Sequence, residues 1–247
     1  MKTYFVVTSV VICKGKVLIL KKSDKDPWAL LASPQCTNEA LYLKKRIFKD
    51  RLGWRDIAFK APGQEGLEDD FLMRADKNPN SAGASQILGI QDAGEAMAAI
   101  LEKARRGAFE GIFIFRHDIS KIFGPKALEE TRRGVKTLIY EGTNENPTAQ
   151  AADFVIPAAC YAEEEGTFTN FEGRVQRIRK ALEPLGLSRP AWRILLELGM
   201  KLGMAWAHPG PESIFDALAK ENEAFRGLDY KKVGDKGIFG NVDRVSN

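Results

Sequence analysis

The segment from Glu163 to Arg179, which reads EEEGTFTNFEGRVQRIR, holds the greatest concentration of residues that could do chemistry. It contains two glycines, two threonines, one asparagine and alternating charges. Glycine amides and the side chains of Asn and Thr can bind a polar ligand that carries phosphate, and Arg174 could pair with the phosphate itself. Asn and Gly are also the usual residues of turns, so an ordinary loop is the competing interpretation.

The chain has few groups that could act in catalysis. His117 follows an apolar run and is interpreted as a hydrogen-bonding residue, whereas His208 lies in a Pro/Gly turn and is expected to be solvated. Cys160 is interpreted as a small core thiol. The three consecutive glutamates that begin at Glu163 are interpreted as a solvated loop. No Walker loop, G-x-S-x-G elbow or H-E-x-x-H motif occurs, so the residues supply no self-sufficient catalytic set.

Composition and charge exclude several classes of protein. The chain has 37 basic and 33 acidic residues with interspersed signs, which is not typical of a nucleic-acid-binding face. Cys13, Cys36 and Cys160 are far apart and form no C-x-x-C pair, so we expect neither a zinc site nor an iron–sulfur cluster. Scattered thiols are typical of a reducing compartment, and no apolar run is long enough to cross a bilayer. We therefore expect a cytoplasmic protein that does not itself insert into a membrane.

Apolar runs that alternate with amphipathic patterns predict the elements that position these residues. Two apolar, β-rich runs within residues 4–22 are joined by CKGK and predict a hairpin. Thr37 is expected to cap a helix that ends at Gly53, and Asp92 with Glu95 is expected to begin another. The expected strands of the main sheet are ALLAS, DDFLMRA, GIFIF, VKTLIY and DFVIP.

This order of elements predicts an α/β fold with a Rossmann-like, largely parallel sheet, flanking helices, an N-terminal β-hairpin and a helical C-terminal part. The predicted units are a hairpin segment of different origin (1–27), an α/β domain (28–183) and a helical extension with a tail (184–247). The carboxyl ends of parallel strands meet at one edge of a sheet, where ligands usually bind. The segments expected along that edge are SPQCTNE, RADKNPNSAG, RHD, EGTNENPT and EEEGTFTNFEGR.

Several blocks between Ala29 and Lys236 resemble the molybdopterin oxidoreductase family. They are SPQCTNEALYLKKRI, DDFLMRADKNPNSAGASQILGI, ADFVIPAACYAEEEGTFTNFEGRVQR with RPAWRILLELGMKLG, and ESIFDALAKENEAFRGLDYKKVGDKGI. Within the family, the chain is most similar to the large iron–sulfur subunit of bacterial NADH–quinone oxidoreductase, complex I. The resemblance implies α/β domains that, in active relatives, hold a bis-pterin guanine dinucleotide around molybdenum. The residues that match the motif near the pterin are Gly166, Thr167, Asn170, Glu172, Gly173 and Arg174.

In the complex I subunit, the resemblance implies a domain that keeps the fold and has lost the cofactor. The family's cluster-binding cysteines, metal-ligating residue and C-terminal barrel are not expected in this chain. We therefore expect no cofactor and no iron–sulfur cluster here, with molybdopterin guanine dinucleotide as the cofactor that the family implies.

The leading hypothesis is a structural scaffold in the hydrophilic arm of the respiratory NADH dehydrogenase, without its own redox centre. Its partners would be the other subunits or a separate cysteine-rich half, and it would reach the inner membrane only through them. The alternative is part of a molybdopterin-guanine-dinucleotide-binding oxidoreductase that is similar to formate dehydrogenase. Whether the chain takes part in an enzyme stays open.

The segment VVTSVVICKGKVLILKKSDKD resembles the opening hairpin of a Nudix hydrolase. Such an enzyme needs a helix whose carboxylates bind magnesium. The corresponding stretch here, KKRIFKDRLGW, has Arg46, Lys49 and Arg51 where carboxylates are needed, and cations cannot bind Mg²⁺. A Nudix-related fusion without hydrolase activity is therefore a third interpretation.

Overall fold

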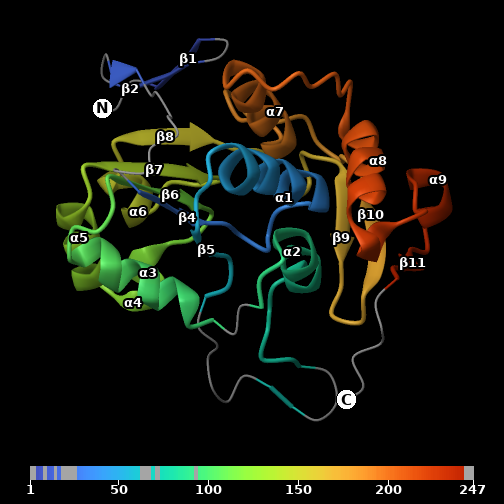
Figure 1. Cartoon of the computed structure of the whole chain (residues 1–247), viewed down its shortest axis with the longest axis horizontal. Helices are drawn as coiled ribbons and strands as arrows, with labels where there is room; N and C mark the ends of the chain where they lie inside the picture. Colours follow the sequence, from blue (N-terminus) through green and yellow to red (C-terminus); the bar gives the residue numbers. More distant parts are fainter. Residues whose placement is uncertain are drawn as a thin grey trace.

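The computed structural model describes residues 4–7, 10–13, 16–17, 27–61, 68–69, 73–91 and 94–241. At its centre lies a parallel sheet of five strands in the order β5-β4-β6-β7-β8 (Figure 1). These strands are β4 (Trp28–Leu31), β5 (Asp56–Ala58), β6 (Gly111–Phe115), β7 (Thr137–Gly142) and β8 (Phe154–Pro157). The predicted α/β class with a largely parallel sheet is confirmed.

Both faces of this sheet are buried. Successive side chains of a strand point to opposite faces, so neighbouring residues of one strand enter different cores. Leu30, Phe113 and Ile139 face one core, whereas Leu31 and Ile114 face the other. All five residues of β6 are buried, which explains the uninterrupted apolar run GIFIF. The first core packs against α1 (Asn38–Lys44), α2 (Ser81–Leu88), α7 (Ala191–Lys201) and α8 (Pro211–Glu221). The second packs against α3 (Ala96–Arg105), α4 (Ile119–Phe123), α5 (Pro125–Gly134) and α6 (Pro147–Ala151).

The helix expected after Thr37 is present. The Thr37 hydroxyl accepts a hydrogen bond from the Ala40 amide and caps α1. The helix continues as a π-helix, η1 (Lys45–Arg51), and Gly53 follows in a left-handed conformation with φ 74°. The helix expected to begin at Asp92 and Glu95 is present as α3, and its N-cap residue Glu95 makes no side-chain capping bond. Asp92 lies outside the described residues.

The edge strand of the main sheet differs from the prediction. This strand is the short β5, within the sequence RDIAFK, which follows directly on the long helix and was not predicted. In the expected strand DDFLMRA, Asp69 and residues 73–75 are not in a strand, and the residues between them lie outside the described part of the chain. A strand of three residues is too short to give a periodic pattern.

A second, antiparallel sheet lies beside α1 and α2, and α9 (Tyr230–Val233) packs against its strand β10 (Arg174–Ile178) (Figure 1). Its order is β11-β10-β9. The hairpin of β9 (Gly166–Thr169) and β10 contains the motif GTFTNFEGR, and β11 (Ile238–Phe239) pairs with β10. Part of the expected irregular tail therefore adds a strand to this sheet. A 3₁₀ turn, η2 (Glu223–Phe225), links α8 to α9.

The N-terminal segment forms its own antiparallel sheet of β1 (Tyr4–Val7), β2 (Val10–Cys13) and β3 (Lys16–Val17). The predicted hairpin is thus present as β2 and β3, and the first apolar run folds back on itself to give β1. The second half of the predicted hairpin, 18–22, lies outside the described residues. None of the helices in the described part of the chain is long and apolar enough to span a membrane.

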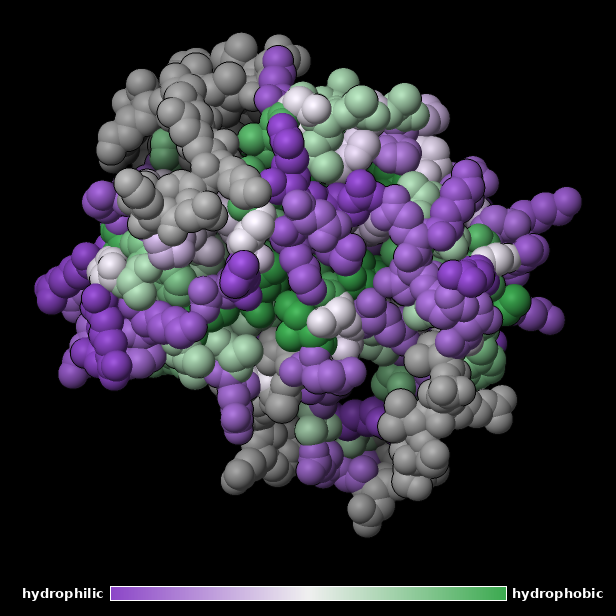
Figure 2. All heavy atoms as spheres, viewed as in Figure 1, coloured by the Kyte–Doolittle hydropathy of each residue, from purple (hydrophilic) through white to green (hydrophobic). Residues whose placement is uncertain are grey.

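Figure 2 shows the surface in the same view, on which hydrophilic residues occupy most of the rim and apolar residues gather near the centre.

Candidate functional site

The carboxyl edge of the main sheet gathers the polar segments that follow its strands, as predicted. Arg116, directly after β6, lies at their meeting point. Its Nη1 donates to the Gln35 carbonyl oxygen at 2.9 Å, and its Nη2 donates to the Ala159 carbonyl oxygen at 3.1 Å. Nη2 also lies 3.1 Å from Glu164 Oε1, and Nε lies 3.8 Å from Glu141 Oε1. Arg116 therefore connects the ends of β4, β6, β7 and β8.

Arg116, Glu141 and Glu164, which we call the edge cluster, are buried. Their side chains are 5%, 1% and 0% exposed. Burial lowers the pKa of Arg116, but its electrostatic interactions with Cys36, Glu141 and Glu164 outweigh it and raise this pKa overall. Burial raises the pKa of Glu164 despite the nearby guanidinium. Both carboxylate oxygens of Glu141 and Nε of Arg116 lack hydrogen-bond partners among the described residues.

The backbone of Arg116 is also unusual. Its φ of 57° makes it the sole described residue other than glycine with a positive φ. This conformation is unfavourable for a side chain that carries a Cβ, and such strain persists only where the surroundings enforce it. Here the four contacts of the guanidinium hold the residue in place. The edge of the sheet where a ligand would ordinarily bind is consequently filled by a side chain of the protein itself.

A second group of buried polar residues joins α1 to the small sheet. Glu39 Oε2 accepts a hydrogen bond from the Thr167 amide, and Oε1 accepts from the hydroxyls of Thr167 and Tyr230, each at 2.9 Å. Asn38 Nδ2 donates to the hydroxyls of Thr167 and Thr169 at 3.0 Å. We call this group the buried polar network; its members are Asn38, Glu39, Asn80, Thr167, Thr169 and Tyr230.

Asn80 extends the network to α2 and to the loop after β4. Its Nδ2 donates to the Cys36 carbonyl oxygen at 2.8 Å, and its Oδ1 accepts from the Thr169 amide at 2.7 Å. Gly83, in the first turn of α2, permits this approach. A Cβ at Gly83 would lie 2.2 Å from Asn80 Oδ1 and 2.3 Å from Asn38 Oδ1. The segments SPQCTNE, NPNSAG and GTFTN are therefore fitted to one another at this junction.

Ionisation within the network is governed by desolvation. Burial raises the pKa of Glu39 from 4.5 to about 7, although the hydrogen bonds from Thr167 and Tyr230 oppose this rise. Burial and the adjacent Glu39 carboxyl also raise the pKa of Tyr230. Glu39 is thus a buried carboxyl whose protonation changes near neutral pH.

The structure distributes the six residues predicted to lie near a pterin along the whole β9–β10 hairpin. Thr167 belongs to the buried polar network, and a Cβ at Gly166 would lie 2.6 Å from Glu39 Oε2. Asn170, Glu172 and Gly173 form the turn, where Asn170 Oδ1 accepts from the amides of Glu172 and Arg174, and Gly173 has φ 81°. The Arg174 guanidinium lies over the Phe239 ring, 4.3 Å from its centroid.

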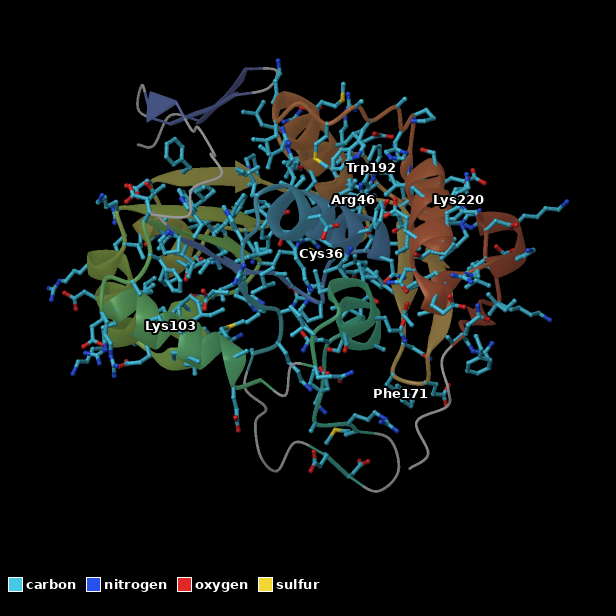
Figure 3. All side chains as sticks on the ribbon, viewed as in Figure 1. Cys36, Arg46, Lys103, Phe171, Trp192 and Lys220 are labelled. Atoms are coloured by element: carbon cyan, nitrogen blue, oxygen red, sulfur yellow. The ribbon has the colours of Figure 1, made fainter. Side chains whose placement is uncertain are left out.

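A cavity of about 1030 Å³ lies between the tip of this hairpin and the residues that follow β5. Asn170 and Glu172 line it, and the Arg74 guanidinium lies over the ring of Phe171, which Figure 3 labels at the hairpin tip. The Lys60 ammonium pairs with Asp76 at 3.2 Å. Burial raises the pKa of Asp76, but its interactions with Ser81, Asn78 and Lys60 outweigh it and lower this pKa overall. The charged residues among the described lining are Lys60, Arg74, Glu68, Asp69, Asp76 and Glu172.

The remaining candidates are placed as follows. His117 is buried, with Nε2 2.7 Å from the Ala32 carbonyl oxygen, which confirms its hydrogen-bonding role. His208 is half-buried rather than solvated, and burial lowers its pKa. Cys160 is only partly buried. The expected solvated loop of glutamates was wrong for Glu164, whose carboxylate is buried against Arg116 and accepts from the Ala191 amide.

Comparison with known proteins decides the family. Residues 70–201 match the molybdopterin oxidoreductase family, which is more than half of the chain. The chain belongs to this family. It is 32% identical over 184 residues to the F420-dependent formate dehydrogenase subunit alpha of Methanocaldococcus jannaschii, covering 72% of this chain and 26% of that subunit. It is 43% identical over 86 residues to the probable oxidoreductase YjgC of Bacillus subtilis, covering 35% of this chain and 9% of the relative.

Acetylene hydratase from Pelobacter acetylenicus is a structural neighbour with a TM-score of 0.42 and 16% identity, over 55% of this chain and 19% of the hydratase. That likeness is too distant to support an inference. The sequence comparisons support the predicted molybdopterin oxidoreductase family, but their formate dehydrogenase-like relatives do not support the expected place with the complex I subunit. They also give no support to the Nudix resemblance.

The family name implies a molybdopterin cofactor, and the described residues do not fit one by themselves. The edge of the sheet is filled by Arg116. The described lining of the cavity carries two cations and four carboxylates, which disfavours a ligand with a negatively charged pyrophosphate. Among the described residues, His, Cys, Asp and Glu form no group of three that could bind a metal ion. The main groups that bind such a cofactor would have to come from elsewhere.

Two residues of the site carried no usable sequence signal. Tyr230 lies 191 positions from Glu39, and no pattern relates the two. Arg116 was within the predicted edge segment RHD, yet its central position depends on four partners from other segments. By contrast, the sequence TNE lies between a buried strand and a helix capped by Thr37. That position could have identified Asn38 and Glu39 as site residues.

Proposed function

We propose that this chain is a structural domain of a formate dehydrogenase-like molybdopterin oxidoreductase. The domain packs beside the cofactor-binding parts of the enzyme and does not hold the cofactor alone. The family match and the formate dehydrogenase names of several relatives support the kind of enzyme. Because the chain spans only 9% to 26% of the relatives named above, the activity belongs to a larger assembly.

The observation that carries the structural role is the buried polar network. Within the motif GTFTN, the most specific part of the family resemblance, the hydroxyls and amides of Thr167 and Thr169 are directed to Asn38, Glu39 and Asn80. These groups are therefore already paired within the protein and are not available to a ligand. Their effect is to fix the hairpin against α1 and α2, so that its tip and the cavity beside it keep a defined position.

A scaffold in the respiratory NADH dehydrogenase is the second candidate. The filled sheet edge at Arg116 favours a domain without a cofactor, as that hypothesis expects. The names of the relatives favour formate dehydrogenase. The two candidates make different predictions about partner polypeptides and about the electron donor.

The test is to tag the chain in its source organism, purify it under mild conditions and identify associated polypeptides by mass spectrometry. We expect formate dehydrogenase-type polypeptides, formate-dependent reduction of a viologen dye, and molybdenum or tungsten in the complex. The chain produced alone should contain neither metal. Association with NADH dehydrogenase subunits and NADH-dependent dye reduction would replace the proposal by the second candidate. Stoichiometric metal and pterin in the chain alone would overturn the structural role.

A further inference from the structure

A buried cysteine and a buried lysine are in contact next to the edge cluster. The Nζ atom of Lys44 lies 2.9 Å from the Sγ atom of Cys36, and both residues are 0% exposed. Cys36 belongs to the loop after β4, and Lys44 lies in the last turn of α1. Figure 3 shows Cys36 close to α1, near the centre of the molecule. The contact therefore joins the carboxyl edge of the sheet to the helix that begins there.

The surroundings of Lys44 are unusual for a lysine. It is among the largest fully buried side chains, and it forms no salt bridge with the described residues. Its Nζ atom lies 3.9 Å from the centroid of the Phe115 ring, so its neighbours are a thiol and an aromatic face. Desolvated lysine amines act as nucleophiles in covalent catalysis.

A guanidinium also lies near the same thiol. Arg116 interacts electrostatically with Cys36, and Nε of Arg116 has no hydrogen-bond partner among the described residues. The sulfur of Cys36 thus lies 2.9 Å from the Lys44 nitrogen, a separation from which an S–N bond can form, and near the Arg116 guanidinium.

We propose that Cys36 and Lys44 form a reversible covalent cross-link when the protein meets a peroxide. Hydrogen peroxide first oxidises the thiol to a sulfenic acid; the O–O bond breaks and one water leaves. The Lys44 amine then attacks the sulfur, an S–N bond forms, the S–O bond breaks and a second water leaves. Sulfur loses two electrons and the peroxide takes them up. Sulfenic acids condense with nitrogen in this way, and thiols reverse the reaction.

The cross-link would act on the loop after β4, which contacts both the edge cluster and the buried polar network. Cys36 provides the carbonyl that accepts from Asn80, and the next residue, Thr37, caps α1. Arg116 holds the carbonyl of the neighbouring Gln35. A bond from Cys36 to Lys44 fixes this loop to α1 and therefore stabilises the junction between the sheet and the buried polar network.

Peptide mapping of the purified full chain tests the proposal. Trypsin cuts after Lys25 and Lys44, so the reduced protein yields the peptide 26–44. After treatment with hydrogen peroxide and alkylation of the remaining thiols, the link blocks cleavage after Lys44. We expect a peptide 26–45 that is lighter than its reduced form by two hydrogen atoms, and dithiothreitol should restore the peptide 26–44.

Cys160→Ser is the matched control and should leave the linked peptide unchanged, whereas Cys36→Ser and Lys44→Met should abolish it. The same treatment of the wild-type chain unfolded in urea should give no link, because the amine is no longer held beside the sulfur. The proposal is overturned if the folded wild-type chain yields only reduced or sulfinic Cys36 with normal cleavage after Lys44. It is equally overturned if the link forms as readily in urea.

Discussion

Glu39 should make the stability of this protein depend on pH in a direction opposite to that of most acidic residues. Its carboxyl is fully buried and accepts three hydrogen bonds, two from Thr167 and one from Tyr230. Burial nevertheless dominates and raises its pKa to about 7. The folded protein therefore holds this proton at a pH at which the unfolded chain has released it.

The magnitude follows from the change in pKa. The pKa rises from 4.5 to about 7, and each pH unit corresponds to about 1.36 kcal/mol. Below pH 4.5 both states are protonated, so Glu39 contributes no penalty. Between pH 4.5 and 7 the unfolded state loses its proton first, and the free energy of unfolding falls with increasing pH. The total loss is about 3 kcal/mol and is complete above pH 7.

Urea unfolding followed by tryptophan fluorescence measures this loss, with Glu39→Gln as the reference. Glutamine has nearly the same shape and resembles the protonated carboxyl, but it does not titrate. Other ionisable groups contribute equally to both proteins and cancel in the difference. We expect the stability of the wild type relative to Glu39→Gln to fall by about 3 kcal/mol between pH 4.5 and pH 7.

A difference that does not change with pH would refute the reasoning, since the carboxyl would then have an ordinary pKa in the folded state. A difference that grows in favour of the wild type as pH rises would show that the hydrogen bonds from Thr167 and Tyr230 outweigh burial. Comparable slopes of free energy against urea concentration in the two proteins would show that both unfold from similar compact states.

Three substitutions test the remaining packing and charge arguments. Arg116→Ala leaves Glu141 and Glu164 buried without their cation and should lower the free energy of unfolding by about 3–5 kcal/mol. Arg106 is exposed, so Arg106→Ala should change the free energy by less than about 0.5 kcal/mol. Equal effects of the two substitutions in urea unfolding would contradict the stabilising role of Arg116 in the edge cluster. Gly83→Ala should destabilise the folded protein by about 1–3 kcal/mol despite the better helix propensity of alanine, because the new Cβ would lie 2.2 Å from Asn80 Oδ1. A higher melting temperature of the variant would instead show that the Asn80 side chain can move away. Thr37→Ala removes the cap of α1 and should cost about 1 kcal/mol in guanidinium unfolding, with Thr37→Ser restoring most of it.

Local pattern was sufficient for the elements that form the core. The runs GIFIF, VKTLIY and DFVIP became β6, β7 and β8. GIFIF is apolar throughout because it is buried on both faces of the parallel sheet, and the other two contain shorter apolar stretches. The helix after Thr37 formed where its cap and its apolar positions predicted it. The strand β5 was missed because three residues that follow a helix have no periodicity to read.

The prediction of a polar edge also followed from sequence, because the direction of parallel strands brings their carboxyl ends together. The order of strands and helices therefore determined which segments would meet. The resemblance carried by GTFTNFEGR and its neighbouring blocks likewise indicated the family, which the match over residues 70–201 shows.

Only the tertiary structure decided how the residues at this edge are used. Glu164 belongs to a run of three glutamates that looks solvated, yet it is buried because Arg116 arrives from another strand. Thr167 looks like a ligand-binding residue, yet Glu39 takes both its amide and its hydroxyl. A polar side chain carries the same hydrogen-bonding groups in either role, and its partner is chosen by packing between segments that lie far apart in the chain. For this reason the sequence determined the fold and the family, whereas the folded structure decided whether the polar residues face a ligand or one another.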